Sequence, residues 1–270
     1  MKTTSIFLGA GAASLLAMPV FAGDHDDEDE IPFDVAEVFF ELNNTDGDLG
    51  IHALIDGEPW KRLQIEDTKE RRILGVGVRG RLRRQGLTEI FFESAEPTFD
   101  DLPPSVFFHR FPEGTYEVEG VSLEGDELES ETEITHAMPA PPVPTVNEVA
   151  AAMQCDDEEP GYDAPVIEAD EYVIAWSPVT RTHPSLGHPQ DAPGLVIANY
   201  QVVVEAELET PSGEEFVSIF SVVLPPDVTE MTIPEEFMEL TEAFKYEVLA
   251  REESWNQTAM ESCFLTEADD

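Results

Sequence analysis

Apolar and polar residues alternate with a period of two along most of this chain, which is the pattern of half-buried β-strands. In the first half, three such stretches follow one another at residues 35–42, 49–55 and 60–66. The Asp-Gly pairs at 46–47 and 56–57 are typical of tight hairpin turns. The three stretches therefore predict a β-meander.

Further alternating stretches predict more strands in the first half, and only residues 102–111 favour a short helix. These strands are expected at residues 73–83, 87–93, 115–121 and 128–136. Short strands at regular spacing are typical of sandwiches and barrels. The predicted fold class is therefore all-β.

A break in composition divides the chain in two. Residues 138–144 read Met-Pro-Ala-Pro-Pro-Val-Pro, and a segment so rich in proline lacks backbone donors and cannot continue a strand ladder. We therefore expect a β-sandwich domain at residues 31–138, a proline-rich linker at 139–144 and a second β-sandwich domain at 145–267. Each of the two larger segments has the normal size of a single domain.

Several stretches of the second half resemble the fibronectin type III family. Residues 174–178, Ile-Ala-Trp-Ser-Pro, resemble its second strand, in which the Trp fills the core between the sheets. Residues 200–204 resemble its third strand, and residues 229–233 resemble its fifth. Leu240 and Tyr246 have the spacing of the family's tyrosine corner, in which the phenol returns its hydroxyl to nearby backbone.

The resemblance covers residues 143–266 and implies a fibronectin type III-like module for binding, spacing or adhesion, with no activity implied by the fold alone. The chain departs from the family pattern at residues 155–171 and 178–195, where the loops beside the Trp strand are long. Loops of a sandwich carry recognition, but lengthening a surface loop also costs little free energy. Both interpretations of the long loops stay open.

The N-terminus has the features of an export signal. Lys2 gives a positive start, residues 6–17 are apolar, and Val-Phe-Ala at 20–22 is a site that signal peptidases accept. We predict a signal peptide at residues 1–22 and an acidic disordered tail at 23–30. The exported protein would be periplasmic or extracellular and would not insert in a membrane after cleavage; the alternative is a retained N-terminal anchor.

The charge balance excludes one class of partner. The chain has 58 acidic and 14 basic residues, for a formal net charge of −44. Proteins that bind nucleic acid by releasing counterions from phosphates need the opposite charge, and anionic lipid would also repel this chain. The partner is therefore predicted to be a protein or a glycan, and not a nucleic acid.

The two cysteines, Cys155 and Cys263, suit an oxidising destination. A single pair in an exported chain is more often a structural disulfide than a catalytic or metal-binding pair. We predict that the two are bridged, and the alternative is a pair of unpaired thiols.

An acidic turn offers the best metal site that the sequence shows. Asn44, Asp46 and Asp48 alternate and can direct several oxygens toward one point, as calcium requires. The alternative is a hairpin loop whose Asn and Asp side chains cap their own backbone. Calcium is the only cofactor that the sequence suggests.

The basic residues gather in one segment. Nine lie between residues 61 and 84: Lys61, Arg62, Lys69, Arg71, Arg72, Arg79, Arg81, Arg83 and Arg84. If residues 73–83 form a strand, Arg79, Arg81 and Arg83 share one face and can bind an acidic partner or an anionic glycan. The alternative is that these arginines pair with the protein's own carboxylates.

Motifs for catalysis are missing from the sequence. It has no Gly-x-Ser-x-Gly elbow, no His-Glu-x-x-His helix and no phosphate-binding glycine loop. We therefore predict a non-catalytic secreted or periplasmic binding protein with no identifiable ligand. Two alternatives are a polysaccharide-active hydrolase or accessory carbohydrate-binding protein, with Trp60 or Trp255 exposed beside paired carboxylates, and a calcium-stabilised structural protein.

Overall fold

The computed structural model describes residues 30–155 and 161–266. The predicted signal peptide and the acidic tail up to residue 29 lie outside the described residues. In the described part, fourteen strands form two sheets, and the three helices are short. This confirms the all-β fold class. Among these residues, none of the helices has the length and apolar character needed to cross a membrane.

The first half contains six strands and two of the helices. These elements are β1 (Val35–Asn43), β2 (Asp48–Glu66), β3 (Arg72–Gly77), α1 (Leu82–Gln85), β4 (Leu87–Glu93), α2 (Pro104–Arg110), β5 (Gly114–Ser122) and β6 (Glu127–Ile134). The long strand β2 pairs with β1 and β4 along its first part and with β3 and β5 along its second part. Because β2 serves both sets of neighbours, all six strands join one sheet.

The turn predicted at Asp56-Gly57 is wrong, since β2 runs through it as one strand. Instead of turning, the chain has irregular register between Asp56 and Trp60, where β2 changes neighbours. A β-carbon at Gly57 would lie 3.2 Å from the ring of Phe33, so the glycine lets the neighbouring chain approach closely. An Asp-Gly pair here therefore marks a strand irregularity and not a hairpin.

The strand predicted at residues 73–83 is also wrong in its second part. Strand β3 ends at Gly77, and residues 82–85 form helix α1. Gly80 has a φ of +63°, a left-handed conformation that ends an extended run and that glycine adopts without steric cost. The arginines that follow Gly77 are therefore not on one strand face.

The second half has a sandwich architecture. Its elements are β7 (Pro144–Val146), β8 (Val149–Ala150), β9 (Val173–Trp176), β10 (Ile197–Glu209), β11 (Glu215–Leu224), β12 (Glu230–Thr232), α3 (Glu235–Met238), β13 (Ala243–Glu252) and β14 (Gln257–Leu265). One sheet has the order β12-β9-β7-β8, and the other contains β11-β10-β13-β14. A core cluster that includes Trp176, Tyr200, Phe244 and Phe264 is formed by residues of both sheets.

Tyr246 is buried in this core, and within the described ranges its hydroxyl makes no hydrogen bond to backbone of the kind that the resemblance implies. The phenol hydrogen-bonds to the side chain of Ser262, and burial raises its pKa. Other tyrosines donate to upstream backbone: in the second half the hydroxyl of Tyr172 donates to the carbonyl of Ile167 at 3.1 Å, and in the first half the hydroxyl of Tyr116 donates to the carbonyl of Pro112 at 3.0 Å. Tyr116 is at the start of β5 and fully buried, so it anchors the entry to that strand.

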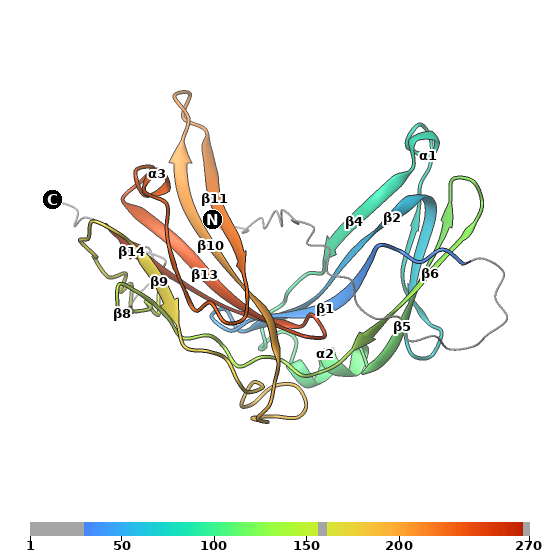
Figure 1. Cartoon of the computed structure of the whole chain (residues 1–270), viewed down its shortest axis with the longest axis horizontal. Coiled ribbons are helices and arrows are strands. Elements are labelled where there is room, and N and C mark those ends of the chain that lie inside the picture. Colours follow the sequence, from blue (N-terminus) through green and yellow to red (C-terminus); the bar gives the residue numbers. More distant parts are fainter. Residues whose placement is uncertain (1–29, 156–160, 267–270) are drawn as a thin grey trace.

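The two halves share one continuous sheet. Strand β14 runs parallel to β1, with Glu41 opposite Gln257 and Asn43 opposite Ala259. The resulting ten-stranded sheet has the order β11-β10-β13-β14-β1-β2-β5-β6, with β3 and β4 also on β2. Figure 1 shows that this sheet bends at β1 and β14, so that the arm with β10 and β11 and the arm with β2 and β4 diverge.

Side-chain contacts also cross the junction. Asn256 is 1% exposed; its Oδ1 accepts from the backbone N–H of Phe40 at 2.9 Å, and its Nδ2 donates to the carbonyl of Thr135 at 2.9 Å. In the proline-rich segment, the carbonyl of Pro139 accepts from the hydroxyl of Thr258. The segment predicted as a linker therefore packs against the second half.

Candidate functional site

A concave recess lies on the face of the large sheet where the two halves meet. Its volume is about 100 Å³, and side chains from β1, β2, β4, β10, β11, β13 and β14 line it. We call this recess the junction trough. Strand alternation explains which side chains reach it: on β13, Glu247, Leu249 and Arg251 line the trough, whereas Tyr246 and Val248 belong to the core.

His52 lies on the β2 side of the trough between carboxylates. Its Nε2 is 2.8 Å from an oxygen of Glu96, and its Nδ1 is 3.6 Å from an oxygen of Glu41. Burial alone would lower the pKa of His52, but the hydrogen bond to Glu96 and the charges of Glu41, Glu96 and Glu93 raise it. Gly50 leaves the space for Glu96, since a β-carbon there would lie 2.0 Å from its carboxylate.

Arg251 is the half-buried cation of the opposite half. Its Nε donates to Oε1 of Gln257 at 2.7 Å, and its guanidinium lies 5.4 Å from the centre of the Phe39 ring. The amide of Gln257 in turn donates to Glu41. Burial lowers the pKa of Arg251, while the negative charges of Glu37 and Glu41 oppose this shift. This chain of contacts joins β13, β14 and β1 across the junction.

Glu247 has no cationic neighbour of this kind. The residue is 4% exposed, and its Oε2 is buried without a hydrogen-bond partner among the described residues. Burial raises the pKa of Glu247 well above its ordinary value, and the charges of Glu41, Glu261 and Glu205 raise it further. A buried carboxyl that faces other carboxyls and lacks a partner is costly to the fold.

Other acids beside the trough share this crowding. Burial, followed by repulsion from Glu96, raises the pKa of Asp48 to about 7. Burial, followed by repulsion from Asp46, raises the pKa of Glu261 to about 7, although the side-chain amide of Asn43 donates to it at 2.8 Å. The trough is therefore a site where negative charge exceeds the positive charge that compensates it.

The predicted calcium ligands lie at the connection of β1 to β2: Asn44 and Asp46 are in the turn and Asp48 begins β2. The structure shows the backbone capping of the alternative interpretation. The Oδ1 of Asn43 accepts from the backbone N–H groups of Thr45 at 3.0 Å and Asp46 at 3.2 Å. The Oδ1 of Asn44 lies 3.1 Å from Nε2 of His183, which comes from the long loop after the Trp strand. Calcium binding by Asn44, Asp46 and Asp48 stays a prediction.

The three arginines of the predicted strand face are exposed and are not on one strand. Arg79 and Arg81 follow β3, and Arg83 is in α1. Within residues 30–155 and 161–266, ion pairs in this basic segment join Arg71 to Asp67 and Arg72 to Glu66, and none involves Arg79, Arg81 or Arg83. The pairing alternative therefore describes the middle of the segment and not its exposed end at residues 79–84.

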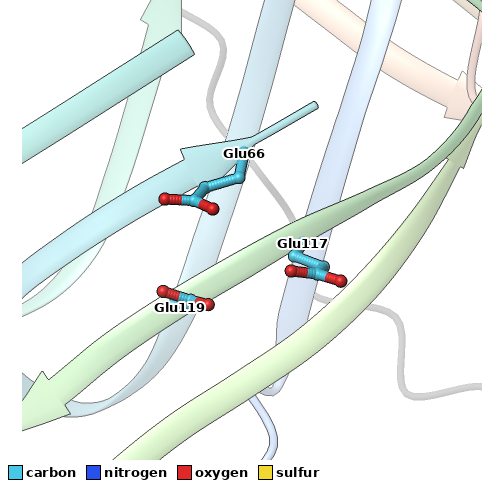
Figure 2. Close-up of side chains that lie close together, drawn as sticks. All are labelled: Glu66, Glu117 and Glu119. Carbon is cyan, nitrogen blue, oxygen red and sulfur yellow. The ribbon is translucent and has the colours of Figure 1, made fainter. Parts of the chain in front are cut away.

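Three glutamates form a second acidic cluster on the first half. The carboxylates of Glu66, Glu117 and Glu119 have ligand atoms within 4.8 Å of one another, and Figure 2 shows them on neighbouring strands. Glu66 lies opposite Glu117 in the register of β2 and β5, and the amide of Gln64 donates to both Glu66 and Glu119. Carboxylate oxygens at this separation can hold a divalent cation, but the neighbouring amide also compensates them.

The disulfide prediction is confirmed. Cys155 and Cys263 are bridged, and their Cα atoms are 5.7 Å apart. The bond ties the segment after β8 to β14, so it closes the second half across a sequence separation of 108 residues.

The aromatic residues named for a hydrolase do not line the trough. Trp60 is fully buried in the core of the first half, where its Nε1 donates to the carbonyl of Thr88 at 3.4 Å. Trp255 is half-buried and is not part of the trough lining. The aromatic walls of the trough are instead Phe39 and Phe91.

Comparison with known proteins gives only weak structural likenesses. No protein-family model and no curated protein matches the chain. Three solved structures are similar: a biofilm-associated protein (BSP domain; 12% identity, TM-score 0.23), a tetra-tandem repeat in the extending region of a large adhesion protein (10%, 0.22) and a bacterial ice-binding adhesin (10%, 0.20). The matches cover 87%, 87% and 89% of this chain and 30%, 50% and 66% of theirs, respectively. Likenesses with such TM-scores carry no argument about function.

Proposed function

We propose that this chain is an exported, non-catalytic binding protein whose ligand site is the junction trough. The observation that carries this proposal is the buried carboxyl of Glu247, whose Oε2 has no hydrogen-bond partner in the described part of the chain, in a recess built from both halves. Burying such a group lowers stability, and costly buried charges gather at functional sites. The disulfide between Cys155 and Cys263 supports export, because such bonds persist in oxidising compartments.

We further propose that the second half is a fibronectin type III-like domain. Support comes from the division of its strands: β7, β9 and β12 lie in one sheet, and β10, β11, β13 and β14 lie in the other. This is how Greek-key sandwiches of the immunoglobulin type divide their strands. Trp176 is buried between the sheets and lies 5.3 Å from the ring of Tyr200, as the resemblance implies.

Blocking the trough tests the proposal. Ile219 lines the trough from the edge strand β11 and is 39% exposed, so an arginine there fills the recess without disturbing the core. Val217 lies two residues away on the same face, is 48% exposed and does not line the trough. Ile219→Arg and Val217→Arg are therefore matched variants.

The experiment is affinity capture from the native envelope or extracellular fraction, quantified by mass spectrometry. We expect the wild type and Val217→Arg to retain the same ligand and Ile219→Arg to lose it. Equal retention by both variants would show that the trough is not the binding site. Release of reducing sugar from polysaccharide by the wild type would overturn the non-catalytic assignment and favour the hydrolase.

A further inference from the structure

The charges around the junction trough do not balance. The acids that line it or act electrostatically on its lining residues come from β1, β2, β4, the segment after β4, β10, β13 and β14: Glu37, Glu41, Asp48, Glu93, Glu96, Glu205, Glu247 and Glu261. The cations that act on them are His52, Lys245 and Arg251. Lys245 also forms an ion pair with the exposed Glu207 at 2.8 Å, so less of its positive charge compensates the acids of the trough.

Glu247 shows where an added positive charge would act. The charged groups that raise the pKa of Glu247 are carboxyls, and its Oε2 has no hydrogen-bond partner in the described structure. A donor that entered the recess would satisfy this oxygen and reduce the repulsion among Glu41, Glu247 and Glu261. An ionised carboxylate with a charged donor also makes a stronger hydrogen bond than a neutral pair does.

The spacing of the acids favours an organic cation over a metal ion. Calcium needs several oxygens within about 2.3–2.6 Å of one point. Among the described residues, the acidic and histidine groups that converge to within 4.8 Å are Glu66, Glu117 and Glu119, which lie outside the trough. Acids spread over several strands can instead be bridged by a group with several N–H donors.

The apolar part of the lining fits the same class. The Phe39 ring already holds the guanidinium of Arg251 at 5.4 Å, and cations are attracted to aromatic faces in this way. Phe91, 43% exposed, offers another ring on the same half, on the other side of His52 from Phe39. Val203 and Leu249 can contact the methylene groups of a flexible chain.

We propose that the junction trough binds an ammonium or guanidinium group carried on a flexible chain, with the carboxyl of Glu247 as its principal acceptor. This inference rests on the proposed function, since it names the ligand class of the same site. The cation has two sources of the same chemistry: a free polyamine, or the exposed tip of the basic segment, Arg79, Arg81, Arg83 and Arg84, of a second copy of this chain.

The test is titration calorimetry at about pH 8 and about 0.15 M NaCl, where diffuse attraction to the acidic surface is screened. The probes are spermidine, a peptide with the sequence of residues 76–86, and calcium chloride. Glu247→Gln removes the principal acceptor carboxyl, and Glu261→Gln is a second variant, at the position beside the trough that lies opposite Glu247 on the neighbouring strand β14. Glu117→Gln is the matched control, because it removes the same charge from the other acidic cluster.

We expect at least one organic probe to bind the wild type, Glu247→Gln to weaken that binding by about tenfold or more, and Glu117→Gln to change it by less than about twofold. Binding of the peptide without binding of spermidine identifies the second copy as the source. In that case, reversing the charges of the four arginines removes self-association in sedimentation equilibrium. Binding of spermidine identifies a free amine as a ligand.

Three results would overturn the inference. Equal weakening by Glu117→Gln, Glu247→Gln and Glu261→Gln would mean diffuse attraction only. Calcium binding that is lost in Glu247→Gln would make the trough a metal site. If neither spermidine nor the peptide binds, the proposed ligand class is excluded. The proposed function would still stand in that case if Ile219→Arg loses the ligand in the capture experiment.

Discussion

Replacing Glu247 by glutamine should stabilise the protein, and the gain should grow with pH. The side chain is 4% exposed, and its pKa is raised by burial and by neighbouring carboxyls. Between the ordinary pKa near 4.5 and the raised folded-state pKa, the carboxyl is protonated in the folded chain and ionised in the unfolded chain. The folded state then binds more protons, so the free energy of unfolding falls as pH rises.

The slope of this effect follows from linkage. For each pH unit in that interval, the wild type loses about 1.4 kcal/mol that a glutamine at the same position keeps. Below the ordinary pKa the two proteins should differ by only about 1 kcal/mol, since glutamine has nearly the same shape. The difference in stability should therefore rise from about pH 5 and level off once pH passes the folded-state pKa.

Urea unfolding at a series of pH values and constant ionic strength, followed by tryptophan fluorescence, measures this difference. Glu215→Gln is the control: Glu215 is exposed on the edge strand β11, so its difference from the wild type should stay flat. The raised pKa values of Asp48 and Glu261 lower stability with pH in all three proteins and largely cancel in the comparison. A flat or falling difference for Glu247→Gln would refute the reasoning that the carboxyl is buried, neutral and uncompensated.

Three further substitutions test the fold. The double variant Cys155→Ser/Cys263→Ser should lose about 4–5 kcal/mol of unfolding free energy in urea, because the disulfide closes a loop with a sequence separation of 108; a loss under about 1 kcal/mol would contradict this origin. Tyr116→Phe should cost about 1 kcal/mol, since its hydroxyl donates to backbone four residues upstream, whereas Tyr162→Phe, 40% exposed, should cost almost nothing. Asn256→Ala should lower the free energy of unfolding by about 3 kcal/mol or more, because it leaves a backbone N–H of β1 unsatisfied at the junction. Unfolding of this variant followed by fluorescence and by circular dichroism should still give one coincident transition. Two separate transitions would show that the halves unfold independently.

The sequence predicted the positions of the strands better than it predicted which strands pair. Period-two alternation located β1 and β5 because each has one apolar face, and that signal is local. Strand pairing is not local: β1 and β14 meet across more than 200 residues, as Glu41 and Gln257 show. The Asp56-Gly57 pair has the composition of a turn, and only the packing of Phe33 against the glycine reveals that the strand continues.

The trough escaped sequence analysis for the same reason. In β13, Lys245, Glu247 and Arg251 alternate with apolar residues, which indicates a face directed away from the core. Nothing in that pattern distinguishes a solvated face from one covered by a bend in the sheet. The acidic residues at positions 46 and 48 were identified as candidates, but their relation to Glu261 depends on the junction between β1 and β14.

The position of the trough couples ligand binding to the junction itself. Repulsion among Glu41, Glu247 and Glu261 acts across β1, β13 and β14, so it opposes the pairing that joins the two halves. The hydrogen bonds of Asn256 and the parallel pairing of β1 with β14 hold the junction against this repulsion. A cation in the trough would remove the repulsion without disturbing these contacts. Binding should therefore stabilise the contact between the halves, and the protein would bind such a ligand more tightly as pH rises through about 7, where Asp48 and Glu261 lose their protons.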